Sequence, residues 1–474
     1  MARTVTRQMS FADLELLRQG VRLEPLLAAI CDFLDKQPAL VERVRRDLVC
    51  GLKKPDKGRR GLTASQTLRA LIVMRVKNWD YRELRERIAD GITLRAFADF
   101  YCEKVPKHDA FNRSFNRLTP ATLKAVNDLV VEAAVKLGLE DGSKLRVDTT
   151  VVETDIHHPT DNTLLWDLVR VLTRLLGRLA KAVELRRIKG FRDRRRAAHR
   201  RMYELQRMTT RQRKGSRHIA TYRALIGIAE EVVAAARTAL DDTAAMRGKD
   251  PLTAAKIEAL RHEIAHYCDL GTGVIGQTRR RVLDGEQVPT SEKIYSIFEP
   301  HTDLIKRGKV RTPVEFGHKV FLAESAKGLI TQYDVLKGNP VDEVHVAPSL
   351  QRHRRIFRRA PSLYGADRGF FSENNLAVCA RGAVATVSIP QRGGHKTPQR
   401  QAYERSPAFK RGQRFRAGIE GRISVLMRGR GMKRCRAESA ERFAVFVAAA
   451  VLANNLMIVG ALLTKRASRC RKAN

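Results

Sequence analysis

Three acidic residues that lie far apart in the chain have surroundings suited to metal-dependent chemistry. Asp148 stands in a β-branched segment, Asp367 stands between small residues and an Arg-Gly pair, and Glu420 follows Arg416 at helical spacing. A charged side chain within a sheet is costly unless it is paired or binds a metal ion. Carboxylate oxygens are the ligands that Mg²⁺ prefers, and two such ions can share three carboxylates. One ion then activates the attacking oxygen, and the other stabilises the leaving oxygen of an in-line phosphoryl transfer.

Each of these residues has a simpler interpretation when it is considered alone. Asp148 could be an ordinary polar strand residue, Asp367 could cap a helix, and Glu420 could pair with Arg416 across one helical turn. A catalytic role therefore requires that the fold bring all three carboxylates to one place.

The elements that must position the carboxylates alternate between strands and helices. A Pro/Gly/Arg-rich loop is expected after the last strand, as far as about Arg411. If the long segment after the first strand is set aside, the order of elements is that of a ribonuclease-H-like domain, in which helices pack on a mixed sheet. We expect the three carboxylates to meet at one end of this sheet. The expected strands are 144–152, 314–322, 328–336, 362–367 and 383–389, and the expected helices are 342–357, 372–380 and 413–428. Lys327-Gly328 predicts a hairpin between the second and third of these strands.

Residues 1–140 predict a helical domain made of short helices. Thr63 and Gln66 have the spacing of a capping box, and Asp80 can cap the next helix. Short helices joined by tight turns resemble a helix-turn-helix module, and we predict that this domain binds DNA. An ordinary helical bundle with a solvated basic face has the same pattern. The arginines expected to face outward are Arg82, Arg85, Arg87 and Arg95.

Residues 156–309 predict an inserted, basic helical arm. Leucines step by three and four residues from Leu165 to Leu179, which is the spacing of a coiled-coil seam. The seam could join two subunits or close a bundle within one chain. An arginine-dense block runs from Arg186 to Arg217, and its density favours contact with nucleic acid over a merely solvated face. The arginines expected to contact DNA there are Arg194, Arg195, Arg196 and Arg200.

The composition of the 474-residue chain supports a polyanionic partner. Lys and Arg number 90 against 51 Asp and Glu, which gives a formal charge of +39. Such a surplus repels itself in the free protein, so nucleic acid is the expected partner, ahead of a membrane. Seven scattered cysteines without a C-x-x-C pair exclude a disulfide framework and a zinc ribbon. The apolar segment 443–463 carries Asn454 and Asn455 at its middle, which favours a packed helix in a soluble, intracellular protein.

Two further motifs are weak. Residues 271–276 fit the G-x-G-x-x-G pattern, but they follow a helical stretch and not a strand, which argues against a dinucleotide site. His157 and His158 have no Cys or Glu at zinc-ligand spacing, so an ordinary loop pair is expected.

The acidic segments resemble those of a DDE transposase from a bacterial insertion sequence. The resemblance rests on Val147-Asp148-Thr-Thr-Val-Val152, Tyr364-Gly-Ala-Asp367-Arg-Gly-Phe370 and Arg416-x-x-x-Glu420. The helical N-terminus, with Phe111-Asn-Arg-Ser-Phe-Asn116 near its end, is similar to the helical domain that precedes the catalytic core in several such families. In total the resemblance covers residues about 15–460.

The chain departs from many of these relatives in two respects. Gln413 and Met427 stand where many relatives have a Tyr before the Arg and a Lys after the Glu, so Arg422 or Arg428 is the expected phosphate contact. Many relatives also insert their extra domain before the Glu helix. The short interval between Asp367 and Glu420 leaves no room for one, which agrees with an arm after the first strand.

The resemblance implies Mg²⁺-dependent cleavage at the ends of a mobile element and transfer of the freed 3′-hydroxyl into target DNA. It implies that Asp148, Asp367 and Glu420 are catalytic residues and ligands of two Mg²⁺ ions, for which Mn²⁺ can substitute. The implied partners are double-stranded DNA, as terminal inverted repeats and target, and further copies of the chain; the implied location is the bacterial cytoplasm, at the nucleoid. DNA contacts are expected near the site from Arg411, Arg414, Arg416 and Arg422.

Two other functions are compatible with the same residues. A ribonuclease-H-like nuclease would cut without strand transfer, and a DNA-binding protein derived from a transposase would do neither. The expected fold is α+β overall, with the catalytic domain split by the helical insertion. The predicted domains are a DNA-binding domain at 1–140, a catalytic domain at 141–155 and 310–465, the arm at 156–309 and a basic tail at 466–474.

Overall fold

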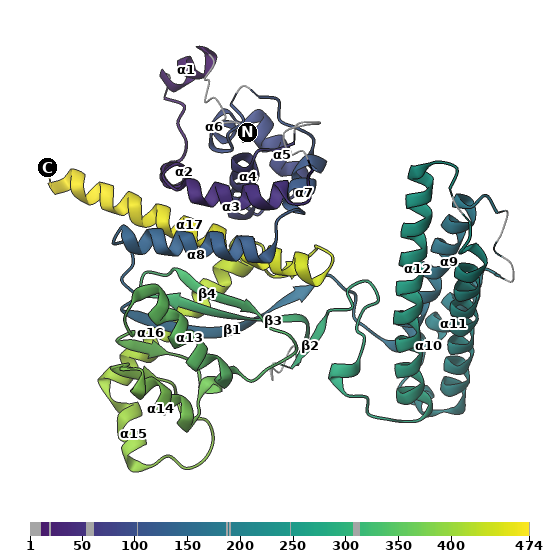
Figure 1. Cartoon of the computed structure of the whole chain (residues 1–474). Helices are drawn as coiled ribbons and strands as arrows, with labels where there is room; N and C mark the ends of the chain where they lie inside the picture. Colours follow the sequence, from purple (N-terminus) through teal and green to yellow (C-terminus); the bar gives the residue numbers. More distant parts are fainter. Residues whose placement is uncertain are drawn as a thin grey trace. The chain divides into compact units, whose positions relative to one another are not determined.

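The computed structural model describes residues 11–18, 20–53, 61–101, 103–185, 188, 191–246, 248–306 and 313–473. Within these residues the fold is α+β, as predicted, with mostly helical structure and a mixed sheet of seven strands (Figure 1). The chain divides into two compact units, which consist of residues 1–153 with 318–474 and of residues 154–317. We call them the sheet unit and the helical unit.

In the described residues the sheet unit begins with helices α1 to α8, and the two helix starts predicted from the sequence are capped as expected. Thr63 and Gln66 form the predicted capping box, and the Asp80 carboxylate accepts hydrogen bonds from two backbone N–H groups of the next helix. Arg95 does not face solvent as predicted, because its guanidinium donates to the carbonyls of Ala89, Tyr101 and Glu103 and closes a turn. The helices are α1 Phe11–Arg18, α2 Pro25–Asp35, α3 Pro38–Val49, α4 Ala64–Lys77, α5 Tyr81–Asp90, α6 Ile92–Phe97, α7 His108–Phe115 and α8 Pro120–Lys136.

The sheet has β3 and β5 as the neighbours of its central strand β1. β5 runs parallel to β1 and to β6, whereas β4 runs antiparallel to β3. Gly328 turns the predicted hairpin between β3 and β4 with a φ of +95°, a conformation that favours glycine. At the other end of β3, residues 314–317 pair with β2. The strands are β1 Lys144–Thr154, β2 Asp303–Lys306, β3 Val314–Ser325, β4 Ile330–Val335, β5 Leu363–Gly365, β6 Thr386–Ser388 and β7 Arg434–Cys435.

The helices between and after these strands agree with the prediction except after β6. The expected loop from β6 to about Arg411 contains helix α15, Pro398–Arg405, and the helix expected at 413–428 begins earlier, as α16, Pro407–Ser424. Both helices start with a Thr or Ser cap followed by proline, which is a favoured first helical residue as well as a loop residue. The other helical elements here are η4 Asp342–His345, α13 Val346–Phe357, η5 Arg368–Phe370, α14 Glu373–Arg381 and η6 Val425–Gly429.

The last helix, α17 (Ala440–Ala473), contains the apolar segment. It includes a stretch that is long and apolar enough to cross a membrane, but 72% of its most hydrophobic window is buried inside the protein. Asn455 accepts a hydrogen bond from the backbone N–H of Ile330 and donates to its carbonyl, as a packed helix requires of a buried amide. α17 shares a hydrophobic core with the N-terminal helices and runs beside α8 (Figure 1). α17 continues through the predicted basic tail as far as Ala473.

The helical unit is a bundle of four long helices with its own hydrophobic core (Figure 1). Every leucine of the predicted seam is buried against the other helices of this unit, so the seam closes a bundle within one chain. Gly271 lies inside α12 where a Cβ would come 2.7 Å from Leu168, so the glycine allows close helix packing and forms no nucleotide loop. The elements are α9 Asp161–Ala182, α10 Arg195–Arg207, η1 Gln212–Lys214, α11 Ser216–Thr243, α12 Pro251–Thr278, η2 Arg279–Leu283 and η3 Thr290–Glu292.

Candidate active site

Two of the predicted acidic residues are placed by the pairing of neighbouring strands. Arg146 on β1 and Gly365 on β5 are partners in a parallel ladder. Asp148 lies two residues after Arg146 on β1, and Asp367 lies two residues after Gly365, just beyond the end of β5. The two residues are therefore level with each other at the carboxyl end of β5. Asp367 has just left β5 and caps the short η5 helix, where its carboxylate accepts from the N–H of Gly369.

All three predicted carboxylates contact one guanidinium group, that of Arg416 on α16. Arg416 Nη2 lies 3.2 Å from Asp148 Oδ2 and 3.9 Å from Asp367 Oδ2. Its other terminal nitrogen, Nη1, lies 2.9 Å from Glu420 Oε1, one helical turn along α16. The fold therefore brings the three acids together, although Glu420 is the most solvent-accessible, with 66% of its side chain exposed.

A buried ion-pair triad fixes α16 against the sheet. Glu324, on β3, has no exposed surface, and its carboxylate oxygens lie 2.7 Å from Arg146 Nε and 3.0 Å from Arg422 Nε. Arg146 also donates to the carbonyl of Phe415 at 2.6 Å, in the middle of α16. Gly418 allows this approach, because a Cβ at that position would collide with the Arg146 guanidinium. The triad thus fixes the position of α16 relative to β1 and β3, and with it the positions of Arg416 and Glu420.

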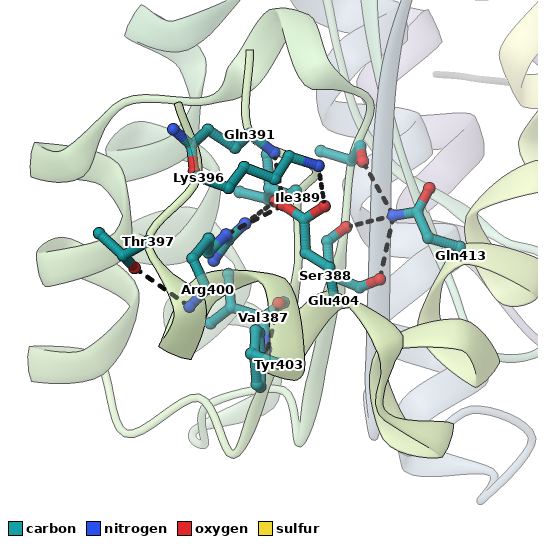
Figure 2. Close-up of polar contacts among 11 residues, drawn as sticks. Val387, Ser388, Ile389, Gln391, Lys396, Thr397, Arg400, Tyr403, Glu404 and Gln413 are labelled. Atoms are coloured by element: carbon teal, nitrogen blue, oxygen red, sulfur yellow. Dashed lines mark hydrogen bonds and ion pairs between the residues drawn. The ribbon is translucent and has the colours of Figure 1, made fainter. Parts of the chain in front are cut away.

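Gln413 makes a second attachment of α16 to the sheet. Its side-chain N–H₂ donates to the carbonyl of Ser388 at 2.8 Å and contacts the Ser388 hydroxyl at 3.0 Å (Figure 2). Gly412 lets the helix approach β6 closely, since a Cβ there would lie 2.5 Å from Ser388 Cβ. Gln413 therefore has a structural use, which is to hold α16 to the end of β6.

Burial dominates the electrostatics of Asp148. Desolvation raises the pKa of Asp148 to about 6, the Arg416 cation opposes the rise, and the nearby Asp367 and Asp342 carboxylates add to it. A carboxyl with this pKa is poised to lose its proton when a cation arrives. The positive charge of Arg416 thus offsets only part of the negative charge of the neighbouring carboxylates.

Asp342 is a fourth acidic residue of this edge, and the sequence prediction missed it. A Cβ on Gly369 would lie 3.0 Å from a carboxylate oxygen of Asp342 and 3.0 Å from one of Asp367, so these two acids are close neighbours. Asp342 Oδ1 accepts from the Thr149 hydroxyl at 2.9 Å and lies 2.8 Å from Lys319 Nζ. In the sequence, Asp342 stands at the start of the helix after β4. Acidic residues are common there because they interact favourably with the helix dipole, so the position gave no reason to assign Asp342 to the site.

The chemistry of the donors fits a divalent metal, although their arrangement in the described residues does not form a closed ligand set. Asp148, Asp342, Asp367 and Glu420 offer the hard oxygen atoms that Mg²⁺ prefers. Within the part of the chain that the structure describes, no group of three or more His, Cys, Asp or Glu residues is positioned to hold an ion. His157, considered above as a metal ligand, lies 3.4 Å from Asp167. Arg416 supplies positive charge to Asp148, Asp367 and Glu420, and Lys319 supplies it to Asp342, so a bound metal would compete with these two cations.

The predicted DNA-contacting arginines fall into two groups. Arg194, Arg195, Arg416 and Arg422 are in ion pairs, with Glu231, Asp193, the three carboxylates and Glu324 respectively. The other four, namely Arg196, Arg200, Arg411 and Arg414, are exposed.

Two basic residues between β6 and α16, Lys396 and Arg400, make structural contacts. Arg400 on α15 donates to the carbonyl of Ile389 and lies 3.0 Å from Glu404, and Lys396 pairs with the same glutamate (Figure 2). Arg400 is also 5.4 Å from the ring centre of Phe371. These contacts fold the segment onto β6.

Comparison with protein families gives one match. Residues 16–117 match a family model described as a transposase domain (DUF772). This range extends from α1 to the end of α7 and contains none of the four acidic residues of the candidate site. The comparisons with curated proteins and with solved structures find no match.

Proposed function

We propose that this chain is a DDE transposase, which cleaves DNA at the ends of an insertion sequence and joins the 3′-hydroxyl to target DNA. The main support is that Asp148, Asp367 and Glu420 all contact the Arg416 guanidinium. The transposase domain at residues 16–117 supports the same class from a separate part of the chain. The protein is then expected at the nucleoid of a bacterial cytoplasm.

The order of the strands supports a ribonuclease-H-like core for this activity. The sequence β4-β3-β1-β5-β6 has an antiparallel hairpin on one side of β1 and parallel strands on the other. In open sheets with parallel strands, sites form beyond the carboxyl ends of the strands. Asp367 follows β5 at that edge, and Asp148 stands beside it.

Within this proposal, Asp148, Asp367 and Glu420 would hold two Mg²⁺ ions, with Mn²⁺ as a substitute. The ions would supply charge stabilisation for the attacking and leaving oxygens of phosphodiester exchange. The chain itself positions the acids through the β1–β5 register and through the Arg146–Glu324–Arg422 contacts. If the ions displaced Arg416 from the carboxylates, its guanidinium would be close enough to contact a DNA phosphate at the site.

DNA binding is proposed to use exposed basic residues of both units. Arg411 and Arg414 lie on the α16 turns just before Arg416, and Arg196 and Arg200 lie on α10. Such contacts release counterions from DNA, so affinity should fall steeply with salt. Pairing of two DNA ends implies a multimer, whose contact must be a surface other than the seam buried inside the bundle.

A DNA-joining assay tests the proposal against its two alternatives. The substrate is a labelled duplex made from the DNA that flanks the reading frame, incubated with Mg²⁺ and a circular target. Joined product supports a transposase, nicks without joining indicate a nuclease, and binding without cleavage indicates a DNA-binding protein.

Asp148→Asn provides the decisive variant in this assay. It should lower cleavage about 10³-fold or more and leave duplex binding unchanged, because it removes a ligand charge and not a DNA contact. Glu153→Gln is the matched control, since Glu153 lies on the same strand and pairs with Arg434 outside the site. Equal activity of Asp148→Asn and the wild type would contradict the proposed site.

A further inference from the structure

Helix α10 carries a row of π-bearing side chains on its surface. His199 and Tyr203 lie one turn apart with their rings nearly parallel, at 12°, and with ring centres 6.2 Å apart. Arg207, one further turn along, places its guanidinium 5.4 Å from the centre of the Tyr203 ring. At the other end of the row, Trp166 of α9 meets His199 edge to face at 5.0 Å. The row therefore continues from the surface of α9 along two turns of α10.

This row is not needed for the core of the helical unit. The core residues of α10 are Ala198, Met202 and Leu205, which are buried, whereas half of the Tyr203 surface is exposed. An exposed aromatic ring with a cation beside it offers a flat face for stacking. The surface around Tyr203 is thus available to a ligand at no cost in core packing.

An open hollow with a positive rim lies beside the row. It has a volume of about 550 Å³, and Tyr203, Arg200 and Arg207 contribute to its lining. The one carboxylate in the lining, Glu204, is engaged by Arg217 at 2.8 Å and by Arg201 at 3.2 Å. Arg200 also lines a second hollow of about 470 Å³ between α10 and α11. The charge left around the Tyr203 ring is therefore positive.

We propose that this α10 surface binds unpaired nucleotides of DNA, with a base stacked on Tyr203 and phosphates held by Arg200 and Arg207. Surfaces that combine aromatic rings with a basic groove bind single strands, because every base has a π-face. In a duplex these faces are covered by neighbouring base pairs, so a surface ring reaches them only at the cost of unstacking the bases. This inference rests on the proposed function, which supplies DNA as the ligand. It adds that the helical unit binds single-stranded DNA.

Fluorescence anisotropy on the full chain tests this inference. The probes are a fluorescein-labelled thymidine oligonucleotide of about 15 nucleotides and a labelled duplex of the same length, both in EDTA so that no cleavage occurs. Tyr203→Ala should weaken binding of the single strand about tenfold and change binding of the duplex less than twofold. Tyr203→Phe should bind like the wild type, because the ring and not the hydroxyl carries the stacking.

Matched controls make each result decisive. Leu252→Ala removes another exposed apolar side chain of the same unit and should change neither affinity. An oligonucleotide with 2-aminopurine at its centre should lose fluorescence on binding the wild type, as a stacked base does, and keep it with Tyr203→Ala. Equal weakening of both probes by Tyr203→Ala, no weakening of either, or a loss of affinity in Tyr203→Phe would overturn the inference. Because no cleavage is measured, these outcomes are independent of the joining assay.

Discussion

The two units of this protein contain the same Arg–Glu–Arg arrangement in opposite environments. In the sheet unit, Glu324 is completely buried between Arg146 and Arg422. In the helical unit, Glu204 lies between Arg201 and Arg217, and the exposed fractions of the three side chains are 22%, 45% and 78% respectively. The hydrogen bond from Arg217 is the main reason why the pKa of Glu204 is lowered, yet water competes with the same contact. Identical side chains thus have a fixed geometry in one unit and remain available to a partner in the other.

This difference has a consequence for function. A buried triad cannot rearrange without leaving a charge uncompensated, so it is suited to hold α16 and the catalytic edge in place. An exposed triad costs little to open, so its arginines can exchange a carboxylate for a phosphate. Under the proposed function, the sheet unit would supply a rigid site for phosphoryl transfer, and the helical unit would supply an adaptable surface for DNA.

The largest expected effect comes from opening the buried triad. Glu324→Gln should lower the free energy of unfolding by about 3–5 kcal/mol, because two arginines lose their buried counter-charge. Glu204→Gln, in the exposed triad, should lower it by less than about 1 kcal/mol. Urea unfolding followed by circular dichroism measures both. Equal losses in the two variants would contradict the comparison.

The second expected effect is a pH dependence of stability that is larger in the sheet unit than in the helical unit. His353 is fully buried on α13 with Nε2 3.0 Å from the carbonyl of Gly142, and burial lowers its pKa from 6.5 to about 4. As the pH falls from 6.5 to 4, the unfolded chain takes up a proton that the folded chain refuses. The wild type should therefore lose up to about 3 kcal/mol of stability from this group over that range.

The variant His353→Gln isolates this contribution. Its free energy of unfolding should fall less than that of the wild type between pH 7 and pH 4.5, because it has no group to protonate. In the helical unit, His218 is partly exposed although burial also lowers its pKa, so His218→Gln should change the pH profile less. Parallel profiles for the wild type and His353→Gln would show that His353 is not held neutral by burial.

The smallest expected effect concerns the cation at the centre of the candidate site. Arg416→Gln should tighten Mn²⁺ binding on the order of tenfold, since the carboxylates lose the guanidinium that competes with the metal. Isothermal titration calorimetry in the absence of DNA measures the affinity. Arg414→Gln is the control, because this exposed neighbour has the same charge but lies outside the carboxylate contacts. Weaker Mn²⁺ binding by Arg416→Gln would mean that Arg416 orients the carboxylates and does not compete.

Much of the fold could be predicted because local rules determine it. The capping box at Thr63, the strand around Asp148 and the hairpin at Gly328 each follow from a few neighbouring residues, and all three are confirmed. The same local rules failed after β6, because Thr-Pro and Ser-Pro start helices as readily as they fill loops. The partner of the leucine seam on α9 could not be predicted either, because a periodic stripe of leucines does not specify which surface will cover it.

The candidate site was predicted in part for the same reason. Asp148, Asp367 and Glu420 could be chosen because each stands at the end or on the face of a recognisable element. Asp342 could not be chosen, because its closeness to Asp367 depends on how the turn after β4 packs against η5. The opposite uses of the arginines, such as Arg422 on buried Glu324 and Arg414 in solvent, are likewise invisible in the sequence.

Most helices and strands, the strong positive charge and three of the acidic residues of the candidate site follow from the amino-acid sequence alone. Three other features depend on the folded chain, namely the contact of Arg416 with these acids, the position of Asp342 beside them and the burial of the leucine seam inside the helical unit. The two sets differ because the underlying interactions act over different ranges. Caps and hydrophobic periodicity act within a few residues, whereas an ion pair between Arg416 and Asp148 depends on the register of strands and on the packing of a helix hundreds of residues away.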